Sequence, residues 1–143
     1  MIGFMELAIA EAQKALEKGE IPVGAVVVCG NEVISAAHNL KETLSDVTAH
    51  AEILAIREAE QKKGDWRLQG CDLYVTLEPC PMCAEAIRQS RLRRLYFGAY
   101  DTQNGAAGSK FDIIGNTTEI YGGICEDECT AILTGFFKNR RAE

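Results

Sequence analysis

The chain has 143 residues, 47% of them hydrophobic and 25% charged, which is an ordinary composition for a globular protein. This length predicts one domain over residues 1–143, able to bury about two thirds of the surface of its unfolded chain. The longest apolar run, VGAVVVCG, is too short to span a bilayer, and the N-terminal residues lack a cationic leader. We therefore expect a cytoplasmic protein that makes no use of a membrane.

The net charge of −6 argues against a broad nucleic-acid-binding surface. Basic residues nevertheless gather in RQSRLRR (88–94) and KNRR (138–141). Each of these islands could equally be a solvated helix face or tail.

The first half of the chain alternates helix and strand patterns. An amphipathic helix is predicted over about 2–18 and ends at Gly19. Residues 21–39 predict two strands joined at Gly30-Asn31, and the valines of the first indicate burial on both faces. A second helix is expected to begin with Thr48 as its N-cap and to end at Gly64.

The second half continues the alternation. A strand over 71–79 leads into a helix that starts with Pro81 at its first position and reaches about residue 90. RLYFGAY (94–100) and TEIYGGI (118–124) predict strands, NGAAGS (104–109) a flexible loop, and residues 126–141 a last helix. Strands alternating with helices predict a three-layer α/β/α fold.

Two of the six cysteines, Cys80 and Cys83, lie in EPCPMCAEAI (78–87). Without a secretion signal, reduced or metal-bound thiols are favoured over disulfides for all six. A redox dithiol of the glutaredoxin type needs a later proline, and none follows Pro81. A structural zinc site needs four protein ligands, for which Cys125 and Cys129 are the completing pair, although such cysteines are more often small buried apolar residues.

A third interpretation combines the two thiols with His50 and Glu52 of TAHAEI (48–53). One histidine and two thiolates leave the fourth zinc position open to water, as in catalytic zinc sites. Zinc lowers the pKa of such a water to about neutrality, and Glu52 could move its proton without binding the metal. Both ligand sets begin helices, whose N-terminal dipoles help to keep thiols ionised.

The pattern H-x-E…P-C-x-x-C is the signature of zinc-dependent nucleobase deaminases. Over nearly its whole length the sequence resembles the tRNA adenosine deaminase branch of the cytidine deaminase-like superfamily. The resemblance is carried, in the family's order and spacing, by GEIPVGAVVV, AHN, TAHAEI, WRL, LYVTLEPCPMCAEAI, YFGAYD, GAAGS and EC…FF.

This resemblance implies that His50, Cys80 and Cys83 bind one zinc ion per chain and that Glu52 is the proton shuttle. The implied reaction is hydrolysis of adenosine to inosine and ammonia at the wobble position of a tRNA. Asn39 would contact the base and Asp101 would lie near the sugar. The family also implies a five-stranded mixed sheet between helices, and a homodimer whose partner subunit helps to form the substrate groove. It further places the two basic islands on or near the substrate-binding face.

Several positions depart from the family pattern in regions expected to surround the target nucleotide. The segment 109–122 is short, and the departing residues are Val47, Glu85, Tyr100, Gln103, Asn104 and Thr117. They leave open the same chemistry on a free base, nucleoside or nucleotide of the guanine, adenine or cytosine type. A non-catalytic zinc-binding module is the alternative from another class of protein, and it would require a fourth protein ligand.

Overall fold

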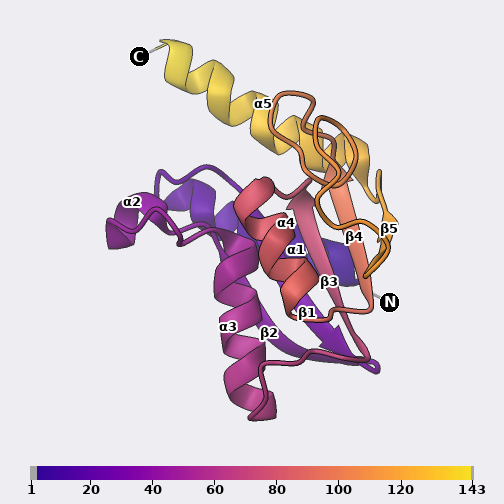
Figure 1. The fold of residues 1–143 in the computed structure, drawn as a ribbon. Coiled ribbons are helices and arrows are strands. Elements are labelled where there is room, and N and C mark those ends of the chain that lie inside the picture. The colour runs from indigo at the N-terminus through magenta and orange to yellow at the C-terminus, as the bar shows by residue number, and fades with distance from the viewer. Residues whose placement is uncertain (1–2, 143) are drawn as a thin grey trace.

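A computed structural model describes residues 3–142, with side chains as far as residue 140, and has an α/β architecture (Figure 1). In chain order its elements are α1 (Phe4–Glu17), β1 (Gly24–Cys29), β2 (Glu32–His38), α2 (Lys41–Leu44), α3 (Ala51–Lys63), β3 (Cys71–Leu77), α4 (Pro81–Gln89), β4 (Arg94–Ala99), β5 (Glu119–Tyr121) and α5 (Glu126–Ala142). Among them, only α2 was not predicted from the sequence.

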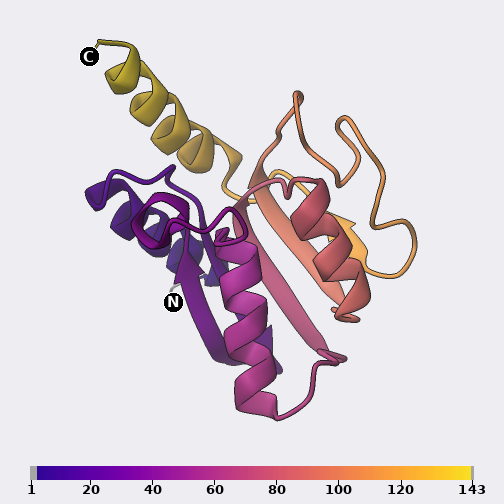
Figure 2. The ribbon, with the colours of Figure 1, turned by 60° about the vertical axis from the view of Figure 1, so that its left-hand side comes forward.

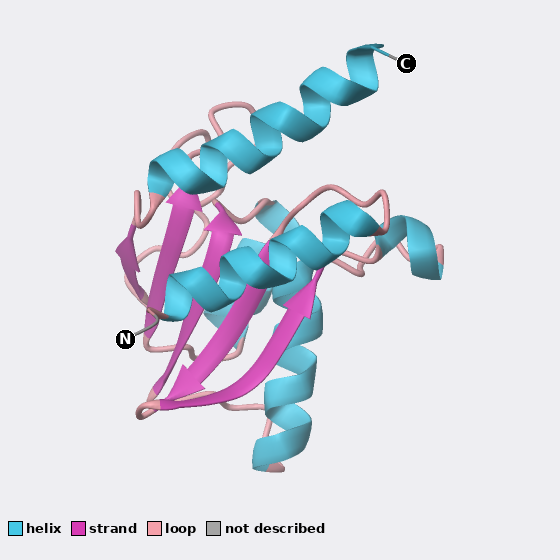
Figure 3. Cartoon of the chain, turned by 180° about the vertical axis from the view of Figure 1, so that it is seen from behind, coloured by secondary structure: helices cyan, strands magenta, loops and turns pink. Residues whose placement is uncertain are grey.

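The five strands form one mixed sheet in the order β2-β1-β3-β4-β5 (Figure 3), which confirms the predicted sheet. β1 pairs antiparallel with β2 and β3, whereas β3, β4 and β5 run parallel. Val26 and Val27 of β1 are both fully buried, as their continuous apolar run indicated. Because β1 and β3 are antiparallel, the start of β1 and the end of β3 lie at the same edge of the sheet.

Helices cover both faces of the sheet. α1 and α5 lie on one face, and α3 and α4 lie on the other, where the two helices run beside each other (Figures 1, 2 and 3). The close contact of α1 with the sheet depends on Gly24, because a Cβ atom there would lie 2.0 Å from the carbonyl oxygen of Ala8. At its C-terminal end, α5 projects beyond the sheet (Figure 1).

The start of α3 differs from the prediction by two residues. His50, not Thr48, is the N-cap, and its backbone is extended. Thr48 is held outside the helix because its hydroxyl and its N–H both donate to the Asp46 carboxylate. The end of α3 at Gly64, with a φ of 69°, and the start of α4 at Pro81 after Cys80 are as predicted.

The prediction of reduced or metal-bound cysteines is wrong for one pair, since Cys29 and Cys71 form a disulfide. The two residues are directly opposite each other on β1 and β3, with their Cα atoms 4.3 Å apart. This bond contrasts with a cytoplasmic location, where thiols are normally kept reduced. The disulfide links the end of β1 to the start of β3, on the opposite side of the sheet from the start of β1.

The segment predicted as a flexible loop, NGAAGS, is instead held by a buried side chain. The backbone N–H groups of Ala107 and Ser109 each donate to the Glu78 carboxylate over 3.0 Å.

None of the helices within residues 3–142 combines the length and apolar character needed to cross a bilayer.

Candidate active site

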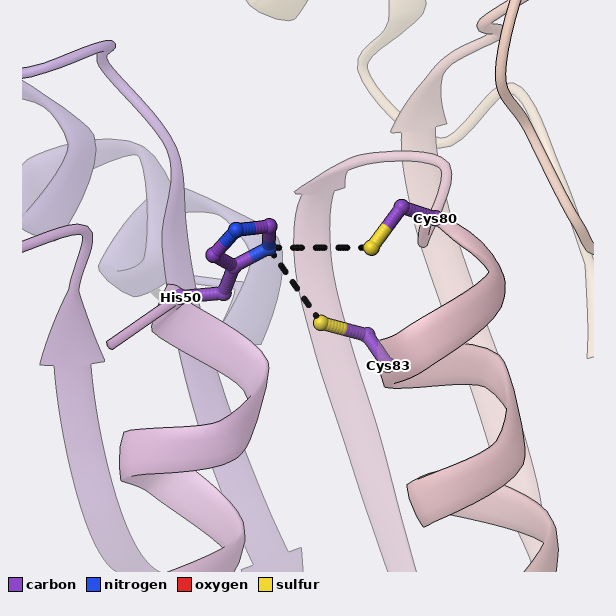
Figure 4. Close-up of side chains that lie close together, drawn as sticks. All are labelled: His50, Cys80 and Cys83. Carbon is purple, nitrogen blue, oxygen red and sulfur yellow. Dashed lines mark hydrogen bonds between the residues drawn. The ribbon is translucent and has the colours of Figure 1, made fainter. Parts of the chain in front are cut away.

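Three side chains that could bind a metal meet where α3 and α4 begin (Figure 4). The Nδ1 atom of His50 lies 3.7 Å from the sulfur of Cys80 and 3.5 Å from the sulfur of Cys83. The three potential ligand atoms all lie within 4.8 Å of one another. The structure thus brings together the histidine and the two thiols that the sequence singled out.

The local fold explains why these side chains converge. His50 and Cys80 are the N-caps of α3 and α4, and Cys83 lies one turn into α4. An N-cap residue has extended backbone, so its side chain lies near the free N–H groups at the end of the helix. Both helices therefore direct the positive end of their dipole towards the cluster, where it stabilises negative charge on sulfur.

The geometry of the cluster suits zinc. Zinc bonds of about 2.0–2.1 Å to nitrogen and 2.3 Å to sulfur, at a tetrahedral angle, place the two atoms about 3.6 Å apart. The two nitrogen–sulfur distances here, 3.5 and 3.7 Å, are close to that separation. Among the described side chains, the cluster does not include Cys125 or Cys129, so a site closed by four protein ligands is not supported.

Interactions within the cluster change the acidity of its members in opposite directions. The hydrogen bond from Cys83, helped by His50, lowers the pKa of the Cys80 thiol to about 4. A hydrogen bond between His50 and Cys80 raises the pKa of His50, and the hydrogen bond between Cys83 and Cys80, together with burial, raises the pKa of Cys83. The cluster therefore gathers negative charge on sulfur, which a bound cation would neutralise.

Glu52 lies beside this cluster and is only 4% exposed. Burial raises the pKa of its carboxyl group to about 7, although the positive charge of His50 and a hydrogen bond from Cys83 oppose this change. A carboxyl group with a pKa near neutrality can both accept and return a proton at physiological pH.

A cavity of about 470 Å³ opens over the cluster and has the size of a typical small-molecule site. Its walls come from the segments just before β1 and just after β2, the end of β3, the loop that follows β4, the beginnings of α2, α3 and α4, and one side of α5. The residues lining it are Ile21, Val23, Asn39, Lys41, His50, Ala51, Glu52, Leu77, Glu78, Cys80, Tyr100, Asp101, Thr102, Gln103, Asn104, Leu133 and Phe137.

Asn39 and Asp101, the two predicted substrate contacts, both line this cavity. Each already has a partner in the protein. The Asn39 side chain accepts a hydrogen bond from the N–H of Lys41 and donates a long one, 3.4 Å, to the carbonyl of Ile21. One oxygen of Asp101 accepts the N–H groups of Gln103 and Asn104, which leaves its second oxygen for a ligand.

The residues that depart from the family pattern divide into two groups. Tyr100, Gln103 and Asn104 line the cavity, as expected. Val47, Glu85 and Thr117 do not line it. Glu85 faces solvent and pairs with Arg88 one turn along α4.

Lys41, Glu78 and Phe137 are among the cavity-lining residues that the sequence did not single out. Glu78 had a detectable signal, because a carboxylate at the end of a buried strand must be hydrogen-bonded or paired. Phe137 was predicted to lie in the last helix, but the pattern does not reveal that this helix reaches the cavity.

The two basic islands have different environments. Arg88, Arg93 and Arg94 form ion pairs with Glu85, Asp72 and Glu119, respectively. Arg94 lies opposite Asp72 at the start of β4, whereas the cavity lies at the end of that strand, so this island is not on the predicted substrate face.

The C-terminal island lies closer to the site. Arg140 lines a smaller cavity of about 210 Å³ that shares Ile21, Asn39, Lys41 and Phe137 with the main one. Its guanidinium group lies 5.3 Å from the ring centroid of Phe136. The side chain of Arg141, the other tail arginine, is outside the described residues.

Comparison with known proteins identifies relatives of this chain. The family model for the cytidine and deoxycytidylate deaminase zinc-binding region matches residues 2–99. A tRNA-specific adenosine deaminase of Bacillus subtilis (strain 168) is 47% identical over 143 residues, covering 96% of this chain and 89% of that protein. A tRNA:A34 deaminase, solved in a study of A-to-I editing at the wobble position, has a TM-score of 0.86 at 48% identity, covering 91% and 98% of the two chains. A guanine deaminase of Bacillus subtilis has a TM-score of 0.66 at 39% identity, covering 76% and 69%.

The cluster predicts about one zinc ion per chain, measured by elemental analysis of the purified protein. Cys83→Ser should lose most of the metal because it removes one of the three ligands. Cys125→Ser is the matched control and should keep it, since Cys125 is outside the cluster. Equal zinc loss in both variants would contradict this assignment.

Proposed function

Because the chain belongs to the tRNA-specific adenosine deaminase family of zinc-dependent deaminases, we propose that it converts adenosine to inosine at the wobble position of a tRNA. The observation that carries the proposal is the His50, Cys80 and Cys83 cluster beside an open cavity that His50 and Cys80 line, with the buried carboxyl group of Glu52 next to it. Three ligands on one side and an open cavity on the other are the arrangement of a catalytic metal site. Because tRNA functions in the cytoplasm, the proposal includes a cytoplasmic site of action.

In this proposal each side chain of the site has a separate task. His50, Cys80 and Cys83 hold zinc, which when bound supplies the Lewis acidity that brings the pKa of a water molecule to about neutrality. Glu52 accepts one proton from the attacking water and passes it to the ring nitrogen, and it then carries the second proton of that water to the departing amine. Adenosine and water become inosine and ammonia, and Glu52 ends in its starting state.

The cavity walls orient the base in front of Glu52. Asn39, at the cavity wall, has hydrogen-bonding capacity left for the edge of a base, and the free oxygen of Asp101 can accept from a sugar hydroxyl. Because the reacting carbon is inaccessible in a stacked helix, the nucleotide must be splayed out of a single-stranded loop.

Deamination of a free base, of the guanine type, is the second candidate, favoured by the likeness to a guanine deaminase. Two observations favour tRNA. The tRNA:A34 deaminase structure matches more of the chain at higher identity, and the cavity adjoins a smaller one that is lined by Arg140 of α5.

The direct test compares substrates at equal concentration: an anticodon stem-loop with adenosine at the wobble position, free adenosine, guanine and cytidine. We expect ammonia and inosine from the stem-loop and little product from the free compounds. Faster release of ammonia from guanine would overturn the tRNA assignment while keeping the deaminase chemistry.

Glu52→Gln is the catalytic control in that assay. Its amide has the size of the carboxyl group but cannot carry the proton, so turnover should fall by about a hundredfold to ten-thousandfold. Zinc content should stay at the wild-type value. Near-normal turnover in the zinc-loaded variant would remove Glu52 from the mechanism.

If tRNA is bound, Arg140 should contact its phosphates. Arg140→Glu should weaken binding of the stem-loop and lower the slope of log affinity against log salt by about 1, because one fewer counterion is released. Turnover of a free nucleoside, where detectable, should not change.

Arg94→Glu is the matched charge reversal, because Arg94 pairs with Glu119 at the sheet edge remote from the cavity. Breaking an exposed pair has little effect on stability, so this variant should bind the stem-loop normally. If the two charge reversals weaken binding equally, the loss comes from the change in net charge, and Arg140 makes no specific contact with the tRNA.

The proposal also includes a homodimer. A groove between α3 and α4, lined in part by Ile53, Ala86 and the half-exposed Trp66, offers the apolar surface that such a contact needs. Light scattering should give twice the chain mass of 15.6 kDa. Ala86→Arg, which introduces a charge into the groove, should give the mass of one chain, and a wild-type mass of 15.6 kDa would refute the dimer.

A further inference from the structure

Glu78 is a buried carboxylate at the cavity for which the proposed chemistry has no use. It follows the last residue of β3 and is only 2% exposed. A carboxylate taken out of water needs several hydrogen bonds to remain stable. All the donors that the structure gives it come from one loop, residues 101–109.

The carboxylate binds both ends of this loop at once. One oxygen accepts the N–H of Asp101 over 3.1 Å and the hydroxyl of Ser109. The other oxygen accepts the N–H groups of Ala107 and Ser109, each over 3.0 Å. A single side chain therefore closes a loop whose ends are some eight residues apart in sequence.

Close packing from the loop side fixes the same contact. A Cβ atom on Gly105 would lie 2.4 Å from the carboxyl carbon of Glu78 and 2.4 Å from the carbonyl oxygen of Asp101. The N–H of Ala106 adds a hydrogen bond to the carbonyl of Pro79, next to Glu78. The loop backbone thus rests directly on Glu78.

The loop that the Glu78 carboxylate holds carries residues that line the cavity. Tyr100, Asp101, Thr102, Gln103 and Asn104 are five consecutive residues that line the cavity. Asp101 is both the first residue bound by Glu78 and the anchor for the turn through Gln103 and Asn104. Displacement at Glu78 would therefore be transmitted to the whole of this wall.

We infer that Glu78 is a positioning residue: its carboxylate holds loop 101–109 as the wall that receives the target nucleotide. This inference rests on the proposed function, because the wall matters only if a nucleotide is bound there. Glu78 itself acts through the loop and has no part in proton transfer.

Glu78→Gln is the direct test. The amide nitrogen of Gln cannot accept a hydrogen bond, so at least one pair of donors on the loop loses its partner. In the zinc-loaded protein, the amides of Asp101, Ala107 and Ser109 should exchange with solvent faster than in the wild type. With the stem-loop, KM should rise about ten- to a hundredfold because the wall is misplaced, while kcat changes little.

Three variants separate this role from general destabilisation. Glu78→Asp keeps the charge and should recover part of the KM, whereas Gly105→Ala displaces the loop from the other side and should reproduce the Gln phenotype. Asp72→Asn is the matched control, since Asp72 is a buried carboxylate near the start of β3, the strand that leads to Glu78, and pairs with Arg93 far from the cavity. It should leave KM and the loop amides unchanged.

Two results would overturn the inference: wild-type amide exchange in Glu78→Gln, or a fall in kcat with unchanged KM. Zinc content is measured in parallel, because Glu78 lies two residues before Cys80, and lost zinc would make Glu78 a support of the metal site instead. The exchange measurement needs no activity, so it tests whether Glu78 holds the loop even if the chain edits no tRNA. If another substrate is deaminated instead, the KM comparison is made with that compound.

Discussion

The site depends on two helices that begin at the same edge of one sheet. The antiparallel pairing of β1 with β3 brings the start of one strand and the end of the other to this edge, and α3 and α4 begin there. Their N-caps, His50 and Cys80, are the residues that meet. Each helix end favours nearby negative charge by about 0.3–1 kcal/mol, and more when partly buried, so two ends together make this a natural place for thiolates and a cation.

Three buried glutamates lie at or near the site, Glu52 and Glu78 at the main cavity and Glu20 at the smaller one beside it, and their hydrogen bonds decide what each can do. Glu20 accepts from the backbone of Glu42 and from Thr43, and although burial opposes it, these bonds lower its pKa. Glu78 is likewise fully engaged by its loop. Glu52 has no such set of donors among the described residues, and burial raises its pKa to about 7. A carboxylate saturated with hydrogen bonds holds structure, whereas one left poorly solvated can exchange a proton.

The parts of the structure that the sequence predicted are those encoded locally. His50, Cys80 and Cys83 lie in short motifs at helix starts, so their spacing and the preferences of helix caps were enough to single them out as candidate ligands. The features that the sequence did not predict depend on contacts between residues that are far apart in the chain. The Cys29–Cys71 disulfide depends on a strand register across 42 residues, and no local pattern reveals it. The glycine-rich segment 104–109 suggested flexibility because its composition does not show that a carboxylate some 30 residues earlier binds it.

A catalytic zinc site held by His50, Cys80 and Cys83 is best tested by X-ray absorption at the zinc edge of the purified protein, because this measurement reports the atoms around the metal. The account predicts two sulfur ligands at about 2.3 Å and two lighter ligands at about 2.0–2.1 Å, one of them imidazole and the other exchangeable with solvent. Substitution of Cys83 by serine should reduce the sulfur count to one. Three or four sulfur ligands, or a sulfur count unchanged by that substitution, would contradict the account.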